Sequence, residues 1–421
     1  MATIAVSVDE TCRAAKRAAR ELQTLSSAVK DAALQAIADA LIDATDEILS
    51  ANARDLEAGE SSGLSEALMD RLALSAERIA QIAAGVRKIA ALPDPVGEVI
   101  DGQTLPNGLQ LRRVRVPLGV VAVVYEARPN VTIDAAALCL KSGNAVVLRG
   151  SSSAMHSNAV LAGVASRAAA AAGLPQHAIS LIGGGDRDEL TQLATQSGVV
   201  DLIIPRGGEG LKAALKGVAT VPVIYAASGN NHVFVDADAD LEMALENSLN
   251  AKLHRPGGCN AAEKLLVHVD AADVFVPRAL AALHAAGVQL HGDERARALA
   301  GDVPVDAATE VDWDTEYLAL ELAAAVVDSA ADAIEHINAH GSGHSEAIVT
   351  SSAQSARAFE LGVDAACVYV NASTRFTDGG EFGMGAEIGN STQKLHARGP
   401  IGLRELCTFK YLIDGDGQVR A

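Results

Sequence analysis

The hydrophobic positions divide the chain into a helical first part and a later part in which strands and helices alternate. Within residues 8–92, apolar residues recur at spacings of three and four, which predicts helices with one buried face. Residues 97–117 instead alternate between apolar and polar positions, and Asn107-Gly108 predicts a two-residue hairpin loop between two strands. The alternating segment within 399–421 is expected to pair with this hairpin.

From residue 118 onward, short apolar runs alternate with helical stretches in two successive series. This rhythm predicts parallel strands covered by helices on both faces, so the expected fold is α/β with two doubly wound parallel sheets. The boundary between the two series is expected near residues 232–240, at the acidic stretch DADAD. Strands are expected at 120–126, 145–150, 178–183, 199–205 and 221–227 in the first series, and at 264–269, 323–328, 346–350 and 366–371 in the second.

Composition and charge narrow the possible functions. The chain has 421 residues, 49% hydrophobic and 21% charged, which is a globular balance with enough length for two or three domains. Its formal net charge of −19 argues against binding to nucleic acid or anionic membranes, because phosphates are bound by clustered Lys and Arg. No apolar run reaches the roughly 18 residues of a membrane helix. Asp9 and Glu10 interrupt the apolar start, so no signal peptide is expected. Five scattered cysteines indicate a reduced, cytoplasmic protein.

Cys259 differs from the other four cysteines, which sit in helical or strand patterns and are interpreted as small hydrophobic residues. It lies in the loop RPGGCN (255–260), where one proline and two glycines leave the backbone open and an arginine is near. A thiol in such a loop is a candidate nucleophile. A solvated turn that contains an incidental cysteine is the alternative.

The common catalytic motifs are missing. The chain has no P-loop and no G-x-S-x-G, H-E-x-x-H or G-x-G-x-x-G pattern. The glycine turn at 182–185 could present backbone N–H groups to a phosphate, or it could be an ordinary strand-to-helix turn. His336, His340 and His344 are spaced four residues apart, but glycines at 341 and 343 end the helix before His344. A solvated helix end is therefore expected rather than a metal site.

Two segments are locally basic. Residues 111–150 carry six basic and two acidic residues, and Arg375, Lys394, His396 and Arg398 surround a stretch rich in glycine and small polar residues. Positive loops on an acidic protein suit small anionic ligands such as phosphates and carboxylates. Ion pairs with the excess surface acids are the alternative for each of these side chains.

The longest motifs resemble those of one family, the gamma-glutamyl phosphate reductases of the aldehyde dehydrogenase superfamily. The similar blocks, in the same order, are VPLGVVAVVYEARPNVTIDAAALCLKSGNAVVLRGSSSA (116–154), IIPRGGEGL (203–211), NAKLHRPGGCNAAEKLLVH (250–268), EHINAHGSGHSEAIVT (335–350) and the block at 368–403. The resemblance implies an aldehyde-dehydrogenase-like fold. It implies an NADP-binding domain at 1–96 and 116–235, a catalytic domain at 236–370, a small β oligomerisation arm at 97–115 and 399–421, and a substrate-site linker at 371–398.

The resemblance also implies a reaction. The family reduces L-glutamate 5-phosphate with NADPH to L-glutamate 5-semialdehyde and phosphate, the second step from glutamate to proline. A cysteine-dependent semialdehyde dehydrogenase that uses another acyl phosphate or a CoA thioester is a close alternative, and a catalytically silent binding protein is a more distant one. The expected partners are further copies of the chain, in a dimer or tetramer, and a glutamate 5-kinase, but neither nucleic acid nor a membrane.

Individual residues match the family motifs. Cys259 matches the nucleophile, and Asn130 matches the asparagine whose side chain stabilises the oxyanion, with the backbone N–H of Cys259 as the second donor. The implied cofactor-binding residues are Arg149, Gly150, Ser151, Arg206, Gly207, Gly208 and Glu316. The arginine and serine favour the 2′-phosphate of NADP, whereas an acidic residue would repel it. Glu316 would hold the nicotinamide ribose, although a plain surface carboxylate is the alternative. The candidates for the substrate carboxylate or phosphate are Asn371, Ser373, Thr374 and Arg375.

Overall fold

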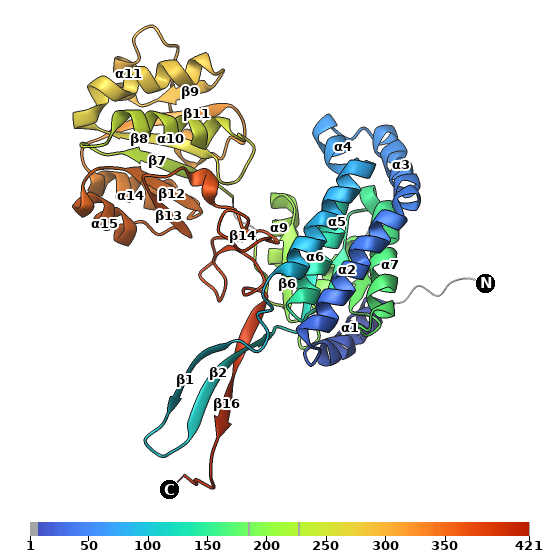
Figure 1. Ribbon diagram of the computed structural model, residues 1–421. Coiled ribbons are helices and arrows are strands. Elements are labelled where there is room, and N and C mark those ends of the chain that lie inside the picture. Colours follow the sequence, from blue (N-terminus) through green and yellow to red (C-terminus); the bar gives the residue numbers. More distant parts are fainter. Residues whose placement is uncertain (1–6, 184–185, 226–227, 421) are drawn as a thin grey trace. The chain divides into compact units, whose positions relative to one another are not determined.

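The chain divides into two compact units in the computed structural model, which describes residues 7–183, 186–225 and 228–420 (Figure 1). Unit 1 comprises residues 1–226, 384–389 and 401–421, and unit 2 comprises residues 227–383 and 390–400. Each unit contains a parallel sheet with helices packed against it, which confirms the predicted α/β class.

The centre of unit 1 is a four-stranded parallel sheet with the strand order β5-β4-β3-β6. Its strands are β3 (Val120–Tyr125), β4 (Ala145–Arg149), β5 (Ile179–Leu181) and β6 (Leu202–Arg206). Every residue of β3 is buried, as expected for a continuous apolar run in a sheet that is covered on both faces.

The predicted helices of the first 92 residues are confirmed. Ser7 begins the first of them with a capping box, in which its side chain accepts the N–H of Glu10 and the Glu10 carboxylate accepts the N–H of Ser7. The helices of unit 1 are α1 (Val8–Leu22), α2 (Ser27–Asp43), α3 (Thr45–Ser61), α4 (Glu66–Leu72), α5 (Ala76–Ala91), α6 (Pro129–Lys141), the short 3₁₀ turn η1 (Ser152–Ala154), α7 (Met155–Ala171), α8 (Arg187–Ala194) and α9 (Glu209–Val218). Helix α2 packs against both α5 and α7.

A separate antiparallel sheet joins the predicted hairpin to the end of the chain. Strand β2 (Gln110–Pro117) pairs with β1 (Val99–Thr104) on one side and with β16 (Cys407–Asp414) on the other, which confirms the expected pairing (Figure 1). The predicted two-residue loop is wrong. Leu105 donates its N–H to the carbonyl of Leu109, so three residues form the loop, and Gly108 takes the positive φ of +86° that closes it.

Unit 2 is built on a seven-stranded parallel sheet with the order β10-β9-β11-β8-β7-β12-β13. Its strands are β7 (Asn231–Val235), β8 (Ala262–His268), β9 (Gln289–Gly292), β10 (Asp306–Ala307), β11 (Glu321–Val327), β12 (Ser345–Val349) and β13 (Cys367–Val370), and a small antiparallel pair is formed by β14 (Asn390–Ser391) and β15 (Gly399–Pro400). The helices are α10 (Leu241–Leu253), α11 (Val269–Ala285), α12 (Glu294–Leu299), α13 (Glu310–Asp314), α14 (Ala330–His340), α15 (Ala353–Gly362) and the 3₁₀ turn η2 (Thr374–Phe376).

The division between the units differs from the expected boundary near 232–240, which had placed 231–235 in the first domain. Strand β7 (Asn231–Val235) pairs with β8 and β12, so it belongs to the second sheet, and the division falls between residues 226 and 227. The strand predicted at 221–227 is also wrong within the described residues, because Val223 forms only an isolated bridge with Ile203. Its last two residues lie outside the described part of the chain.

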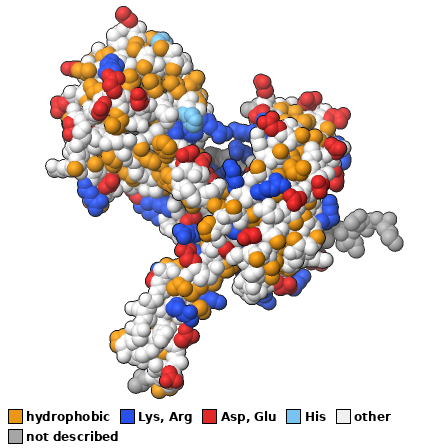
Figure 2. Space-filling model, viewed as in Figure 1, with side chains coloured by type: hydrophobic (Ala, Val, Ile, Leu, Met, Phe, Trp, Pro, Cys, Tyr) orange, Lys and Arg blue, Asp and Glu red, His pale blue; other side chains and the backbone are white. Residues whose placement is uncertain are grey.

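The first basic segment, 111–150, does not form a single anion site. The three arginines of β2 each pair with a carboxylate: Arg112 with Asp414, Arg113 with Asp101 and Arg115 with Glu98. The buried ammonium of Lys141 contacts Asp31 and donates to the carbonyl of Ala90 at 2.7 Å, which ties α6 to α2 and α5. Figure 2 likewise shows the Lys and Arg side chains of the visible face in several separate places. For these side chains the ion-pair interpretation is correct.

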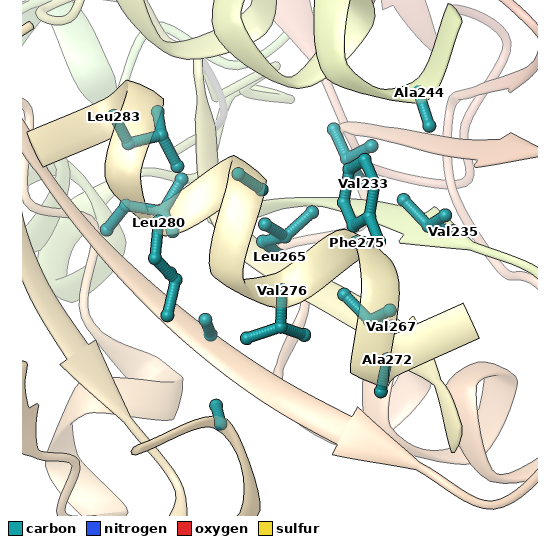
Figure 3. Close-up of a cluster of buried hydrophobic side chains, with 14 of the residues drawn as sticks. Val233, Val235, Ala244, Leu265, Val267, Ala272, Phe275, Val276, Leu280 and Leu283 are labelled. Carbon is teal, nitrogen blue, oxygen red and sulfur yellow. The ribbon is translucent and has the colours of Figure 1, made fainter. Parts of the chain in front are cut away.

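The core of unit 2 surrounds α11, on which Phe275 packs among aliphatic side chains of the sheet, including Val233 and Leu265 (Figure 3). Phe275 is completely buried, whereas its neighbour Val274 is 57% exposed. In the described part of the chain, none of the helices has both the length and the apolar character that crossing a bilayer demands.

We expect Phe275→Ala to lower the free energy of unfolding by about 3–5 kcal/mol, because it removes a buried ring and leaves a cavity. Val274→Ala on the same helix should change it by less than about 0.5 kcal/mol, because that side chain is mostly solvated. Urea unfolding of both variants measures the difference. Equal losses would contradict the described packing of α11.

Candidate active site

Cys259 lies in the loop between α10 and β8 and is the one half-buried cysteine of the chain, while the other four are buried. The loop is tightened by hydrogen bonds from the N–H of Gly258 to the carbonyl of Arg255 and from the N–H of Ala261 to the carbonyl of Gly258. Burial raises the pKa of Cys12 and that of Cys407 to about 12, and it also raises the pKa of Cys139. These three thiols therefore stay protonated and inert near neutral pH. Cys367 is also buried, so Cys259 is the best placed nucleophile.

Positive charge surrounds this cysteine. The guanidinium of Arg375 lies so close that a Cβ on Gly258 would be 2.9 Å from its Nη1, and its Nε is 3.3 Å from Nδ1 of His254. Burial lowers the pKa of Arg375, the nearby charge of Arg255 lowers it further, and the interaction with Cys259 opposes both. Arginine beside a sulfur atom favours the thiolate and offers hydrogen bonds to an anionic substrate.

The backbone of the nucleophile is held from the neighbouring strand. The amide of Asn231, at the start of β7, donates to the carbonyl of Cys259 at 2.9 Å and to that of Ala261 at 2.7 Å. Its oxygen accepts the N–H of Ser345, the first residue of β12, at 3.1 Å. Gly229 approaches the same loop so closely that a Cβ there would lie 1.6 Å from the carbonyl oxygen of Cys259. Only glycine fits at this position.

The next residue, Asn260, holds the predicted substrate segment against the nucleophile. Its side-chain amide donates to the carbonyls of Arg375 at 3.2 Å and of Thr377 at 2.9 Å. In return, the buried hydroxyl of Thr374 donates to the carbonyl of Asn260 at 2.7 Å. Ser373 is also buried and caps η2 by accepting the N–H of Arg375. Thr374 and Arg375 therefore lie against the Cys259 loop, and Ser373 is bonded to Arg375.

Asn371 uses its side chain differently. Its oxygen accepts the N–H of Thr350 at 2.9 Å, and its nitrogen donates to the carbonyl of the same residue at 3.0 Å. The backbone of Asn371 takes a left-handed φ of +57°, which asparagine tolerates better than most residues. Both polar atoms of this side chain are thus committed to closing the turn after β13.

Glu316 lies close to the same loop. Its carboxylate accepts the N–H of Gly229 at 2.6 Å, and the preceding carbonyl, of Thr315, accepts a hydrogen bond at 2.8 Å from the buried ammonium of Lys264. Gly229 in turn touches Cys259, so this predicted ribose ligand and the nucleophile share one backbone support. Glu316 is therefore bonded to the protein backbone, whereas the alternative expected a carboxylate that only faces solvent.

Asn130 belongs to unit 1, where it is exposed in the first turn of α6. Its side-chain amide donates to the carboxylate of Asp134 at 3.0 Å. Burial raises the pKa of Asp134 to about 6, against the opposing effects of the Asn130 hydrogen bond and the charge of Arg206. The hydrogen bond fixes the orientation of the amide and leaves its second N–H for another acceptor.

The carboxyl ends of the strands in unit 1 carry the predicted cofactor residues. Arg149 ends β4, donates from Nη2 to the carbonyl of Asp186 at 2.8 Å, and has a buried Nε with no partner among the described residues. A Cβ on Gly150 would be 2.1 Å from the amide nitrogen of Asn158, so glycine is required there for packing. Ser151 follows and shares a hydrogen bond with Ser153. An orphaned guanidinium N–H at this edge suits a phosphate ligand.

The turn after β6 places Arg206 and two glycines at the same edge of the sheet. Gly208 caps α9 and donates its N–H to the carboxylate of Glu126 at 3.2 Å, while a Cβ on Gly207 would be 2.8 Å from that carboxylate. Arg206 lies against Gly389 of the same unit. The glycine turn at 182–185, for which phosphate binding and an ordinary turn were both considered, includes residues outside the described part of the chain.

The histidine series is divided by the end of α14, as predicted, because the helix ends at His340 and His344 lies beyond it. The expectation of a solvated helix end is wrong for His336. Its ring packs edge-on against His232 and Trp313, and burial lowers its pKa to about 3. His340 contacts the carboxylate of Asp314 at 2.9 Å.

Three residues with clear positioning contacts were not predicted: Gly229, Asn231 and Asn260. Each acts on a segment distant in the chain, up to 117 residues away for the bond from Asn260 to Thr377. The sequence signal that could have pointed to them is a glycine or asparagine at or just before the start of a strand. That signal is too common to be specific.

Comparison with known proteins gives consistent results. The aldehyde dehydrogenase family matches residues 2–299. The gamma-glutamyl phosphate reductase of Thermobifida fusca (strain YX) is 55% identical over 420 residues, covering 100% of both chains, and that of Moorella thermoacetica is 57% identical over 418 residues, covering 99% of both. The crystal structure of gamma-glutamyl phosphate reductase from Thermotoga maritima superposes with a TM-score of 0.96 at 44% identity, covering 99% of this chain and 100% of the other.

We expect Gly229→Ala to displace the Cys259 loop, because the added methyl group would overlap the Cys259 carbonyl. The free energy of unfolding should fall by about 1–3 kcal/mol, and iodoacetamide should modify Cys259 at a changed rate. Gly257→Ala, within the Cys259 loop itself, is the control, because its Cβ would meet only an ordinary contact at 3.6 Å. Mass spectrometry of the alkylated residue gives the rates, and identical rates for the two variants would refute the contact.

Proposed function

The chain belongs to the gamma-glutamyl phosphate reductases of the aldehyde dehydrogenase family, and we propose that it reduces L-glutamate 5-phosphate to L-glutamate 5-semialdehyde and phosphate. This reaction is the second step from glutamate to proline. The observation that carries the proposal is the open Cys259 loop with the Arg375 guanidinium beside it. That arrangement joins a nucleophile to a cation that suits a phosphorylated substrate.

The proposed chemistry proceeds through the sulfur of Cys259. Its thiolate attacks the acyl carbon of the substrate, the bond to phosphate breaks, and phosphate leaves with the electron pair, giving a thioester. When bound, a nicotinamide cofactor would supply the hydride needed to reduce this thioester. The resulting thiohemiacetal releases the aldehyde and regenerates the thiolate.

Two donors are proposed to stabilise the oxyanion that develops during attack. The first is the side-chain amide of Asn130, whose orientation is fixed by Asp134. The second is the backbone N–H of Cys259, on a loop held by the two bonds from Asn231. A preorganised donor needs no reorientation as charge develops, which is why rigid support of both groups favours catalysis.

The segment that precedes β7 supports transfer to phosphate rather than to water. Hydrolytic members of the superfamily carry a glutamate base in the stretch that corresponds to YAASGN (225–230), and this stretch contains no acidic residue. Without a base that activates water, the thioester persists until hydride or phosphate reaches it.

Members of the aldehyde dehydrogenase family use a nicotinamide cofactor, and we propose NADPH for this chain. The buried Nε of Arg149, which has no partner among the residues that the structure describes, supports a site for the 2′-phosphate, with Gly150 and Ser151 completing the turn. The turn formed by Arg206, Gly207 and Gly208 is proposed to lie along the cofactor. Glu316 is proposed to hold the nicotinamide ribose.

For the substrate, we propose that Arg375 binds the phosphate or the carboxylate of L-glutamate 5-phosphate. Ser373 and Thr374 support the same segment through their bonds to Arg375 and Asn260. Asn371 is proposed to act in the site through the turn it closes, since its side chain is bonded to Thr350. The homo-oligomer, the contact with glutamate 5-kinase and the cytoplasmic location stay predictions.

We expect Cys259→Ala to abolish turnover, by about a thousandfold or more, because no other residue can form the thioester. The reverse reaction with pyrroline-5-carboxylate, phosphate and NADP⁺ is convenient, and NADPH absorbance measures it. Cys139→Ala is the matched control, because that thiol is buried and protonated.

Arsenate or phosphate should be required in this assay. A rate that does not depend on either anion would contradict the acyl-phosphate mechanism, even if Cys259 were essential. A rate that needs CoA instead would indicate a related enzyme that transfers the acyl group to CoA rather than to phosphate.

We expect Arg149→Ala to lower kcat/KM for NADP⁺ by about tenfold or more, because it removes a charged donor to the 2′-phosphate. The value for NAD⁺ should change little, since NAD⁺ lacks this phosphate. Arg167→Ala, on the helix α7 of the same unit, is a control for general loss of positive charge. Equal losses with both coenzymes would refute the assigned role.

A further inference from the structure

Unit 2 contains a polar cavity of about 460 Å³ that the proposed reaction does not use. It lies where α14 ends and β12 begins, and the segment from Thr392 to Arg398 forms another wall. Its volume falls within the range of small-molecule sites. Glu346, Ser342, Lys394 and Asp364 also line it, and we call it the Glu346 cavity.

Glu346 is completely buried but has one uncommitted oxygen. Oε2 accepts the backbone N–H of His232 at 2.6 Å and lies 3.0 Å from Nδ1 of the same residue. Oε1 has no partner among the described residues, and a Cβ on Gly341 would be 2.9 Å from it. Glycine at position 341 therefore leaves this oxygen open where the helix ends, at the wall of the cavity.

The carboxyl group of Glu346 favours its neutral form. Burial raises its pKa well above the usual range, although the His232 N–H and the charge of Lys264 oppose this effect. Since Oε2 already accepts a hydrogen bond, the proton is best placed on Oε1, and a protonated oxygen is a donor.

The other uncommitted groups of the cavity are donors as well. Arg398 donates from Nη2 to the carboxylate of Asp364 at 3.0 Å, while its buried Nε has no partner within the described segments. The hydroxyl of Ser342 accepts the N–H of Asn230 at 3.0 Å and keeps its own proton for another acceptor. Thr392 adds a second hydroxyl to the wall.

The charged side chains that line the cavity also carry a net positive charge. The carboxylate of Asp364 is shared between Lys394 and Arg398, so the two cations exceed it by one positive charge. A ligand that offers only acceptors and carries negative charge would satisfy these groups. We propose that the Glu346 cavity is a binding site for a small oxyanion, a phosphate or carboxylate group, held by Arg398 Nε, Ser342 and Glu346.

Crystals of the full-length chain soaked in selenate test the location directly. We expect an anomalous selenium peak within hydrogen-bond distance of Arg398 Nε. No peak in the cavity at saturating selenate would overturn the proposal.

Calorimetric titration with inorganic phosphate and with acetate tests the donors. Comparing the two affinities shows whether the cavity prefers a phosphate or a carboxylate group. The titration is done in an Arg149→Ala, Arg375→Met background, which removes the two anion sites of the proposed reaction. Here Arg398→Lys keeps a charge beside Asp364 but loses the Nε–H, so affinity should fall by about tenfold or more. Thr392→Val, an isosteric change, should weaken binding by a smaller factor.

Glu346→Gln is the matched control, because its amide is neutral and can still donate from the Oε1 position. Its affinity should stay within about threefold of the background protein. If the background protein binds neither anion, or if Arg398→Lys binds as tightly as its parent, the proposal fails. These readouts do not depend on turnover, so they are independent of the proposed reaction.

Discussion

One buried amide holds the candidate active site together. Asn231 joins the loop of the nucleophile to the starts of two strands, through the carbonyls of Cys259 and Ala261 and the N–H of Ser345. Parallel strands place their starts along one edge of a sheet, but they do not fix the loops that precede them. A fully buried side chain with three such bonds supplies that constraint, because breaking any one of them would leave a polar group without water.

The electrostatics of the site are local and do not follow from the net charge. The arginines of β2 each pair with a carboxylate of the same unit, whereas Arg375 is held against the Cys259 loop by the bonds of Asn260. A charge of −19 on the whole chain describes its exterior and its solubility. The guanidinium of Arg375 is partly desolvated, and a charge in such a place interacts more strongly because water screens it less.

The sequence predicted periodic structure and local chemistry better than it predicted contacts between segments. The helices before residue 92, the parallel strands and the exceptional loop of Cys259 all have local signals, namely spacing, apolar runs and glycines. The boundary was misplaced because DADAD resembles a linker, while the apolar run before it joins the second sheet. Gly229 and Asn231 were missed because their roles exist only after distant segments meet. His336 was misjudged because helical spacing does not reveal which neighbours cover a ring.

The pairing of β16 with β2 has a consequence for how the chain is made. The partner residues Leu111 and Ile413 are separated by about 300 positions, so β2 emerges from the ribosome long before its neighbour exists. During synthesis it presents an open edge, which other nascent chains could extend. Arg113 and Arg115 have carboxylate partners that precede them in the chain, but Arg112 does not, and its charge discourages such pairing. Arg112 is neutralised only when the last strand, with Asp414, has arrived. The arm thus keeps one unpaired charge on β2 during synthesis, and completion of the chain neutralises it.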